Sequence, residues 1–126
     1  MGWAQGLGLR WSREPPGLVA VFVPDASHEG RPGFLHGGLA ATALDETMAA
    51  LGWALDEIHT VTATLSLRYR EPVPVDGGAV RVEAWRDRAG PRRVQKVHGR
   101  LVLAGGVVAV EATGLFVRVD AGRGDE

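Results

Sequence analysis

The sequence predicts an α+β fold in which a curled antiparallel sheet wraps around one long helix. Two observations predict it. Only one long segment, residues 37–55, has the apolar spacing of a helix, whereas segments on both sides of it alternate apolar and polar side chains as strands do. A single helix must cover one face of such a sheet, and the sheet must in turn bury the apolar stripe of the helix.

Before the helix, "LGLRWS" and "LVAVFV" flank "REPPG", in which two prolines and a glycine mark a turn. This pattern predicts a strand pair. The next segment, "PDASHEGRPG", has the composition of a loop that leads into the helix.

The helix is predicted from five apolar residues whose spacing alternates between three and four, which puts them on one helical face. They are Ala41, Leu44, Met48, Leu51 and Leu55. After the helix, "TVTATLSLRYREPVPV" and "AVRVEAWRDR" alternate with a period of two, as strands do. The last segment, "RRVQKVHGRLVLAGGVVAVEATGLFVRV", predicts two long strands around a turn at Gly105 and Gly106. The predicted order is two strands, one helix and four strands.

The composition narrows the classes of function. A chain of 126 residues with 45% hydrophobic residues suits one domain, residues 1–126. A formal net charge of −1 attracts neither nucleic acid nor an anionic membrane, and the absence of cysteine excludes disulfides, thiolate zinc sites and cysteine nucleophiles. The first residues, "MGWAQGLGLRW", lack a signal-peptide pattern, and no stretch is apolar enough to span a bilayer, so a cytoplasmic location is expected.

Asp45 stands inside the predicted helix, and its neighbours on the same helical face are small except for Met48. These small side chains leave open space beside the carboxylate, which suits a carboxylate with a catalytic role. Gly52 indicates close approach of a ligand or a second backbone, because a glycine inside a helix costs about 1 kcal/mol relative to alanine. The alternative is a solvated helix acid paired with an arginine. The neighbours are Gly38, Ala41, Thr42, Met48, Ala49 and Gly52.

The triplet formed by His36, Gly37 and Gly38 begins the predicted helix. The first N–H groups of a helix have no internal partners and carry the positive end of its dipole. They can therefore bind an anion, or a carbonyl oxygen that is becoming one. The alternative is that the glycines only start the helix and that His36 has no role beyond its first turn.

Two competing kinds of site are excluded. A lipase-type oxyanion loop needs a serine in a G-x-S-x-G elbow, and Ser12, Ser27 and Ser66 all lack that context. A zinc site is not supported because no two histidines are four residues apart and no cysteine is present. The sequence therefore predicts neither a metal nor a cofactor.

The segment "HEGRPGFLHGGLAATALDE" closely resembles the signature of hotdog-fold acyl-CoA thioesterases, which include the phenylacetate-pathway type. The agreement covers the H-G-G triplet, the acid nine positions after its histidine and the "pG-x-x-HGG" approach. It continues in "TATLSLRYREPV", and the whole resemblance spans residues 28–119. It implies a hotdog fold and the hydrolysis of an acyl-CoA to a free acid and coenzyme A.

The resemblance also implies roles for single residues. The backbone N–H of Gly37 polarises the thioester carbonyl, and Asp45 acts as nucleophile or general base. Thr62 helps to hold the attacking water, and His36 orients the site. Some family members have Asn or Gln six positions before the motif histidine, where this sequence has Gly30.

The expected substrate contacts are Gly38 and a set of arginines, because the guanidinium fork binds phosphate in a bidentate manner. For any single arginine, a solvated strand residue is the alternative. A non-catalytic acyl-CoA or acyl-carrier binding module and a hotdog hydratase or dehydratase stay open as other functions. The arginines are Arg68, Arg70, Arg86, Arg88, Arg92 and Arg93.

Helix geometry adds a prediction about assembly. Gly37 and Asp45 are eight residues apart, which is about 12 Å along a helix axis. They cannot both lie about 3 Å from one reacting carbon. An antiparallel second helix, related by a two-fold axis, would bring Gly37 of one chain to Asp45 of the other. A homodimer, or a dimer of dimers, with active sites at the dimer interface is therefore expected.

Overall fold

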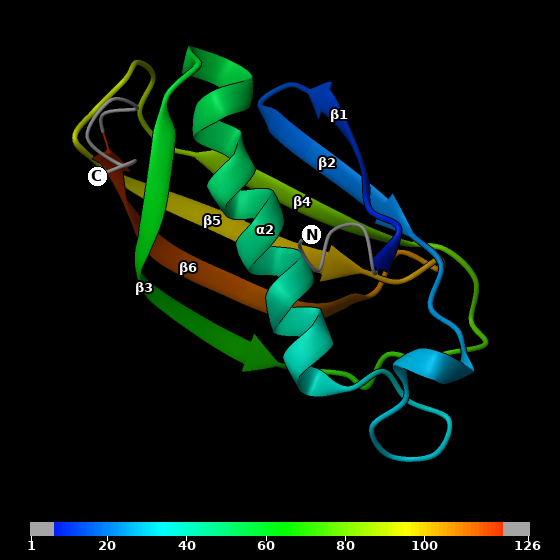
Figure 1. The fold of residues 1–126 in the computed structure, drawn as a ribbon. Coiled ribbons are helices and arrows are strands. Elements are labelled where there is room, and N and C mark those ends of the chain that lie inside the picture. The colour runs from blue at the N-terminus through cyan, green and yellow to red at the C-terminus, as the bar shows by residue number, and fades with distance from the viewer. Residues whose placement is uncertain (1–6, 120–126) are drawn as a thin grey trace.

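A computed structural model describes residues 7–119, and in it one long helix lies across a curled antiparallel sheet (Figure 1). The predicted α+β fold and the order of two strands, one helix and four strands are confirmed. The strands are β1 (Arg10–Glu14), β2 (Gly17–Phe22), β3 (His59–Tyr69), β4 (Val80–Arg86), β5 (Val94–Val102) and β6 (Val108–Val119). The sheet order is β1-β2-β4-β5-β6-β3, so β1 and β3 are its two edges. A short 3₁₀ turn, η1 (Ala26–His28), precedes the helix α2 (Gly37–Asp56).

The helix buries the predicted apolar face against the sheet. Leu44, Met48 and Leu51 are fully buried, whereas Ala41 is half-buried because the buried stripe runs through the neighbouring Ala40. The helix passes so close to β5 that a Cβ atom on Gly99 would lie 2.7 Å from the sulfur of Met48. None of the helices formed by residues 7–119 is long and apolar enough to cross a membrane.

The strand β3 is more exposed than its alternating sequence suggests. Val61 and Tyr69 are 51% and 53% exposed, because β3 pairs with β6 on one side and with no other strand on its second side. A β-bulge interrupts its register immediately after Thr62. The pattern predicted the strand correctly, but position at the sheet edge, not the pattern, decides its exposure.

Gly52 is explained by the chain's own sheet. A Cβ atom at this position would lie 3.3 Å from side-chain atoms of both Ile58 and Thr60, where the chain leaves the helix and enters β3. The body that approaches Gly52 in this structure is therefore β3. The sequence predicted close approach of a ligand or a second backbone at Gly52, and the segment found there is the one that enters β3.

Candidate active site

Asp45 lies near the middle of α2 on its half-exposed face, and Thr62 on β3 lies beside it. The Thr62 hydroxyl donates a hydrogen bond to Oδ1 of Asp45 at 2.7 Å. The bulge after Thr62 changes the direction of the strand at this point, as bulges beside functional sites commonly do. Among the hydrogen bonds of residues 7–119, none engages Oδ2 of Asp45, so that oxygen is free to accept a proton or to attack.

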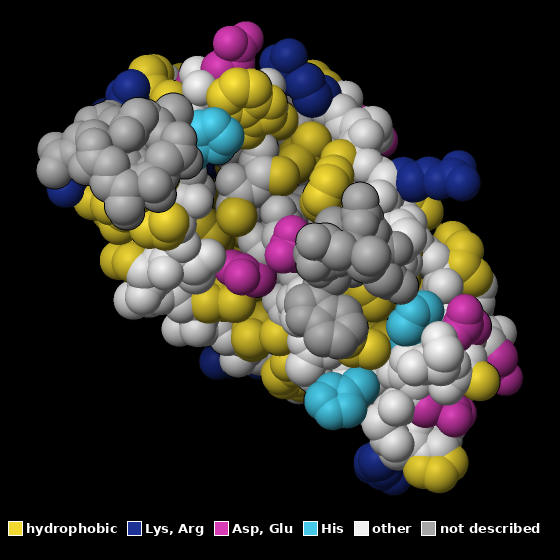
Figure 2. All heavy atoms as spheres, viewed as in Figure 1, with side chains coloured by type: hydrophobic (Ala, Val, Ile, Leu, Met, Phe, Trp, Pro, Cys, Tyr) yellow, Lys and Arg dark blue, Asp and Glu magenta, His cyan; other side chains and the backbone are white. Residues whose placement is uncertain are grey.

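The space-filling view shows one face of the molecule, over which α2 runs. Acidic side chains lie near the middle of the face that α2 presents, with hydrophobic side chains on either side of them (Figure 2). Glu46, which follows Asp45 in α2, is half-buried like it. No hydrogen bond to Glu46 is found within residues 7–119, whereas Asp45 is held by Thr62.

His36 caps the start of α2. Its Nδ1 accepts a hydrogen bond from the Gly38 N–H at 2.9 Å, so this nitrogen carries no proton in the capped state. Its backbone carbonyl accepts from the N–H groups of Leu39 and Ala40 at 3.0 and 3.2 Å. His36 thus occupies two of the N–H groups that a helix start leaves without partners, those of Gly38 and Leu39, and the bond from Ala40 is the first regular bond of the helix.

The Gly37 N–H is the group that this cap leaves free. Within the described residues, no hydrogen bond from it is found, although the Gly37 carbonyl accepts one from the Tyr69 hydroxyl at 2.7 Å. An unoccupied N–H at the positive end of a helix is the kind of donor that stabilises an oxyanion. The geometry therefore leaves Gly37 available for the role that the resemblance implies.

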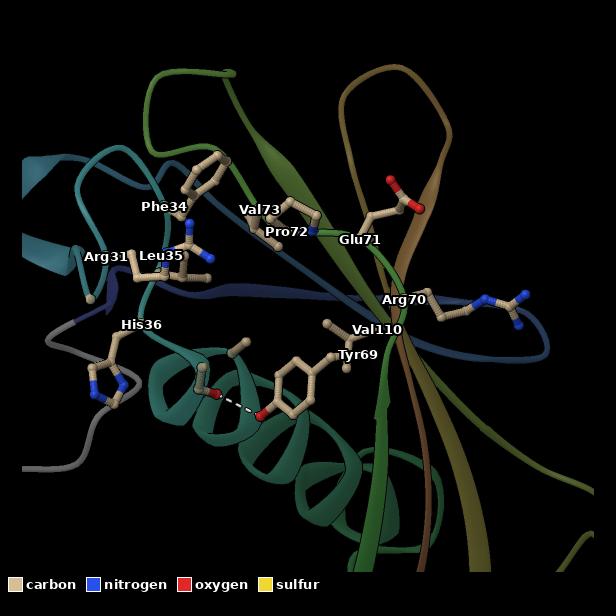
Figure 3. A pocket seen from close by; sticks show the side chains of 13 residues that line it. Arg31, Phe34, Leu35, His36, Tyr69, Arg70, Glu71, Pro72, Val73 and Val110 are labelled. Atoms are coloured by element: carbon tan, nitrogen blue, oxygen red, sulfur yellow. Dashed lines mark hydrogen bonds between the residues drawn. The ribbon is translucent and has the colours of Figure 1, made fainter.

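Tyr69 is a site residue that the sequence did not reveal. It ends β3 and reaches the first residue of α2, which lies 32 positions earlier in the chain. Burial raises the pKa of the Tyr69 hydroxyl, so it stays protonated and able to donate. The close-up shows this bond and the ring of Tyr69 between the helix and Val110 (Figure 3). No sequence spacing links a tyrosine to a glycine so far away.

A cavity of about 580 Å³ lies beside Gly37. Its volume is within the usual range for a small-molecule site. Arg70 also lines it, but its side chain extends away from the other lining residues (Figure 3). The apolar walls come from Phe34, Leu35, Ala40, Pro72, Val73 and Val110.

A sequence profile of the thioesterase superfamily matches residues 32–110, which include His36, Gly37, Asp45 and Thr62. The chain belongs to the thioesterase superfamily. The family suggested by the H-G-G triplet and the acid after it is thereby confirmed.

Individual members of the superfamily are similar to most of this chain. An acyl-coenzyme A thioesterase THEM4 of Xenopus laevis is 32% identical over 110 residues, which are 81% of this chain and 45% of that protein. The chain thus spans about half the length of such relatives. The crystal structure of a phenylacetic acid degradation-related protein of Ralstonia eutropha is 26% identical, with a TM-score of 0.80 over 93% of this chain and 89% of that one.

The hotdog fold expected of a superfamily member is also confirmed. The PaaI protein of the E. coli phenylacetic acid degradation operon has a TM-score of 0.81 over 94% of this chain and 84% of its own. Since it is only 15% identical, this likeness concerns the fold alone. Within residues 7–119 there is no group of three or more histidines and acids that could hold a metal ion.

The arginines that the sequence offered as candidates for phosphate contacts are spread over the molecule. Arg70 follows β3 near the start of α2, where it pairs with Glu111 at 3.0 Å, and Arg68 is exposed near the end of β3. Arg92 and Arg93 lie in the exposed connection between β4 and β5, at the other end of α2 (Figure 1). One chain therefore does not bring all four beside Gly37.

Two of the expected substrate contacts, Arg86 and Gly38, already interact with other residues of the chain. Arg86, one of the candidates for a phosphate contact, turns inward and forms a nearly buried ion pair with Asp56 at the end of α2, so it is not open to a phosphate in this chain. The Gly38 N–H is already used by His36. Its part in substrate binding stays a prediction.

Proposed function

We propose that this domain hydrolyses an acyl-CoA thioester to a free acid and coenzyme A. The hydrogen bond that holds Asp45 to Thr62 carries the proposal, because it fixes one acid of a thioesterase-superfamily chain with its second oxygen free. The name of the Xenopus relative, acyl-coenzyme A thioesterase, supports the same substrate class. The cytoplasmic location and the single domain expected from the sequence stay predictions.

Asp45 can act in either of two ways. As a general base it takes a proton from a water that attacks the thioester carbon, and as a nucleophile it attacks that carbon itself and is released by water later. In both cases the carbonyl oxygen becomes negative, the C–S bond then breaks, and the thiolate leaves and gains a proton. A free helix-terminal N–H, such as that of Gly37, stabilises the negative oxygen.

Each site is proposed to take its two halves from two chains. About 12 Å of helix separates Gly37 from Asp45 along one chain, which is too far for both groups to serve one carbon. The free edge of β3 supports a partner copy, because an unpaired edge offers a row of N–H and C=O groups to a second strand. Antiparallel pairing of β3 with its copy would set two α2 helices antiparallel on the same side of a continuous sheet.

The cavity beside Gly37 is proposed to hold the acyl group. Its walls are mainly apolar, which suits a hydrocarbon or aromatic acyl chain better than the charged nucleotide of coenzyme A. Arg68 and Arg70 flank this end of the molecule and remain the candidates for phosphate contacts from the same chain. Arg92 and Arg93 could serve only a substrate that reaches the other end of α2.

The proposal is tested by steady release of free thiol over a panel of acyl-CoA substrates. Asp45→Asn should lower kcat to less than about a tenth of wild type, since a smaller loss is under 1.4 kcal/mol of barrier and too little for a nucleophile or base. Glu46→Gln is the matched control, because it neutralises the adjacent half-buried acid and should leave kcat nearly unchanged.

The same assay separates the other functions. A binding module would bind the substrates without releasing thiol, and a hydratase would change an enoyl-CoA without releasing coenzyme A. Thiol release that survives Asp45→Asn but is lost in Glu46→Gln would move the catalytic role to Glu46.

A further inference from the structure

The peptide group between Gly37 and Gly38 is held from both sides. Its carbonyl accepts a hydrogen bond from the Tyr69 hydroxyl at 2.7 Å, and its N–H donates to Nδ1 of His36 at 2.9 Å. Two consecutive glycines would otherwise leave this segment free to rotate, because glycine has the widest range of backbone conformations. The two bonds fix the plane of one peptide immediately after the Gly37 N–H.

A fixed peptide plane matters for the donor beside it. The Gly37 N–H and the Gly37 carbonyl are attached to the same Cα, so holding the carbonyl limits the directions in which the N–H can point. Stabilisation of an oxyanion depends on donors that are oriented before charge develops, because reorientation during the reaction costs free energy. His36 secures one side of this segment by capping, and Tyr69 secures the other.

The strand β3 contacts both the acid, Asp45, and the residue that carries the free N–H, Gly37. Thr62 on this strand holds Asp45, and Tyr69 at its end holds the Gly37 carbonyl. A displacement of β3 would therefore disturb the acid and the donor together.

We propose that Tyr69 is a positioning residue that orients the Gly37 N–H as the oxyanion donor. This inference rests on the proposed thioester hydrolysis. Its ring also packs beside Gly37, since a Cβ added there would lie 3.7 Å from three atoms of the Tyr69 side chain. Tyr69→Phe therefore tests the hydrogen bond separately from the packing, because it keeps the ring and removes only the hydroxyl.

Thr60→Val is the matched control. The Thr60 hydroxyl also donates from β3 to a carbonyl of α2, that of Ala49 at 3.4 Å, but it does so 12 residues after Gly37 along the helix. Loss of one net hydrogen bond in the transition state should lower kcat by about 3- to 10-fold in Tyr69→Phe. KM should change little, and in Thr60→Val both constants should stay within about twofold of wild type.

Amide hydrogen exchange gives a readout that does not depend on turnover. Exchange at the Gly38 N–H, which is hydrogen-bonded to His36, should be faster in Tyr69→Phe than in wild type, and unchanged in Thr60→Val. Faster exchange with an unchanged kcat would overturn the proposal, and so would unchanged exchange. A wild-type protein without thiol release would overturn the proposed function, while faster exchange in Tyr69→Phe would still establish that Tyr69 fixes this peptide.

Discussion

At the scale of single residues, the two glycines after His36 have different tasks. A Cβ atom on Gly37 would meet only the Tyr69 ring, at an ordinary contact distance of 3.7 Å. A Cβ atom on Gly38 would lie 3.0 Å from Cε1 and Nδ1 of the capping His36 imidazole. The second glycine therefore makes room for the cap, whereas the surroundings of the first leave space for a side chain.

Gly37→Ala should keep the N–H and most of the activity. Gly38→Ala should push the His36 ring away and lose the cap, at a cost of about 0.5–2 kcal/mol in the free energy of unfolding and with a larger loss of kcat. Thiol release and denaturant unfolding of both variants measure these effects. Equal loss of activity in the two variants would contradict the distinction.

Tyr69 can be titrated without interference, because it is the only tyrosine in the sequence. Burial raises its pKa, so the ultraviolet absorbance of tyrosinate should appear with a midpoint above the ordinary value of about 10. A raised pKa stabilises the fold below the unfolded value and loses that contribution as the pH rises through the folded value. Tyr69→Phe should lack this alkaline loss. A midpoint at or below about 10 would contradict the raised pKa of this partly buried tyrosine.

At the scale of elements, side-chain interactions hold both ends of α2 in place. His36 and Tyr69 hold its start, and the ion pair of Asp56 with Arg86 of β4 holds its end. The Arg86 and Asp56 side chains are only 9% and 14% exposed, and Arg86 also donates to Gln95 at 3.3 Å. Removing one partner of such a pair leaves a charge with little access to water.

Asp56→Ala should therefore lower the free energy of unfolding by about 3–5 kcal/mol. Replacing both partners, as in Asp56→Leu with Arg86→Met, should restore most of that loss, because an apolar pair needs no charge compensation. Denaturant unfolding of the single and double variants measures the difference. A double variant as unstable as Asp56→Ala would show that the pair has a role that apolar packing cannot replace.

The helix was predictable because its signal is local. The predicted residues 37–55 differ from the observed Gly37–Asp56 by one residue, and Asp45 stands out within that one segment. The exposure of β3 was not predictable in this way. It depends on β6 pairing with both β5 and β3, which leaves β3 at an edge, and no pattern within β3 records that arrangement.

The site was predictable only in part. His36, Gly37, Asp45 and Thr62 follow from the resemblance, but the hydroxyl of Tyr69 reaches Gly37 across 32 positions of chain. The same limit applies to Gly52, whose neighbours Ile58 and Thr60 follow the helix in the same chain. Contacts between distant segments have no signature in the spacing of either segment.

At the scale of the whole molecule, each site is proposed to use Gly37 of one chain and Asp45 of another. Asp45→Asn removes the acid. Gly37→Pro removes the N–H, and proline is well tolerated at the first position of a helix. The backbone of His36, at φ −59° and ψ 131°, is already the conformation favoured before a proline. Gly37→Pro should therefore fold, and each variant alone should be inactive.

The most direct measurement is to unfold the two variants together, refold them and measure thiol release. Equal amounts should give about half mixed dimers, each with one intact site, so about a quarter of wild-type activity should return. As a control, a chain with both substitutions should form inactive mixed dimers with wild type, since each of their sites would lack one group. No recovery in the first mixture, with mixed dimers detected by mass spectrometry and Gly37→Pro shown to be folded, would contradict the shared site.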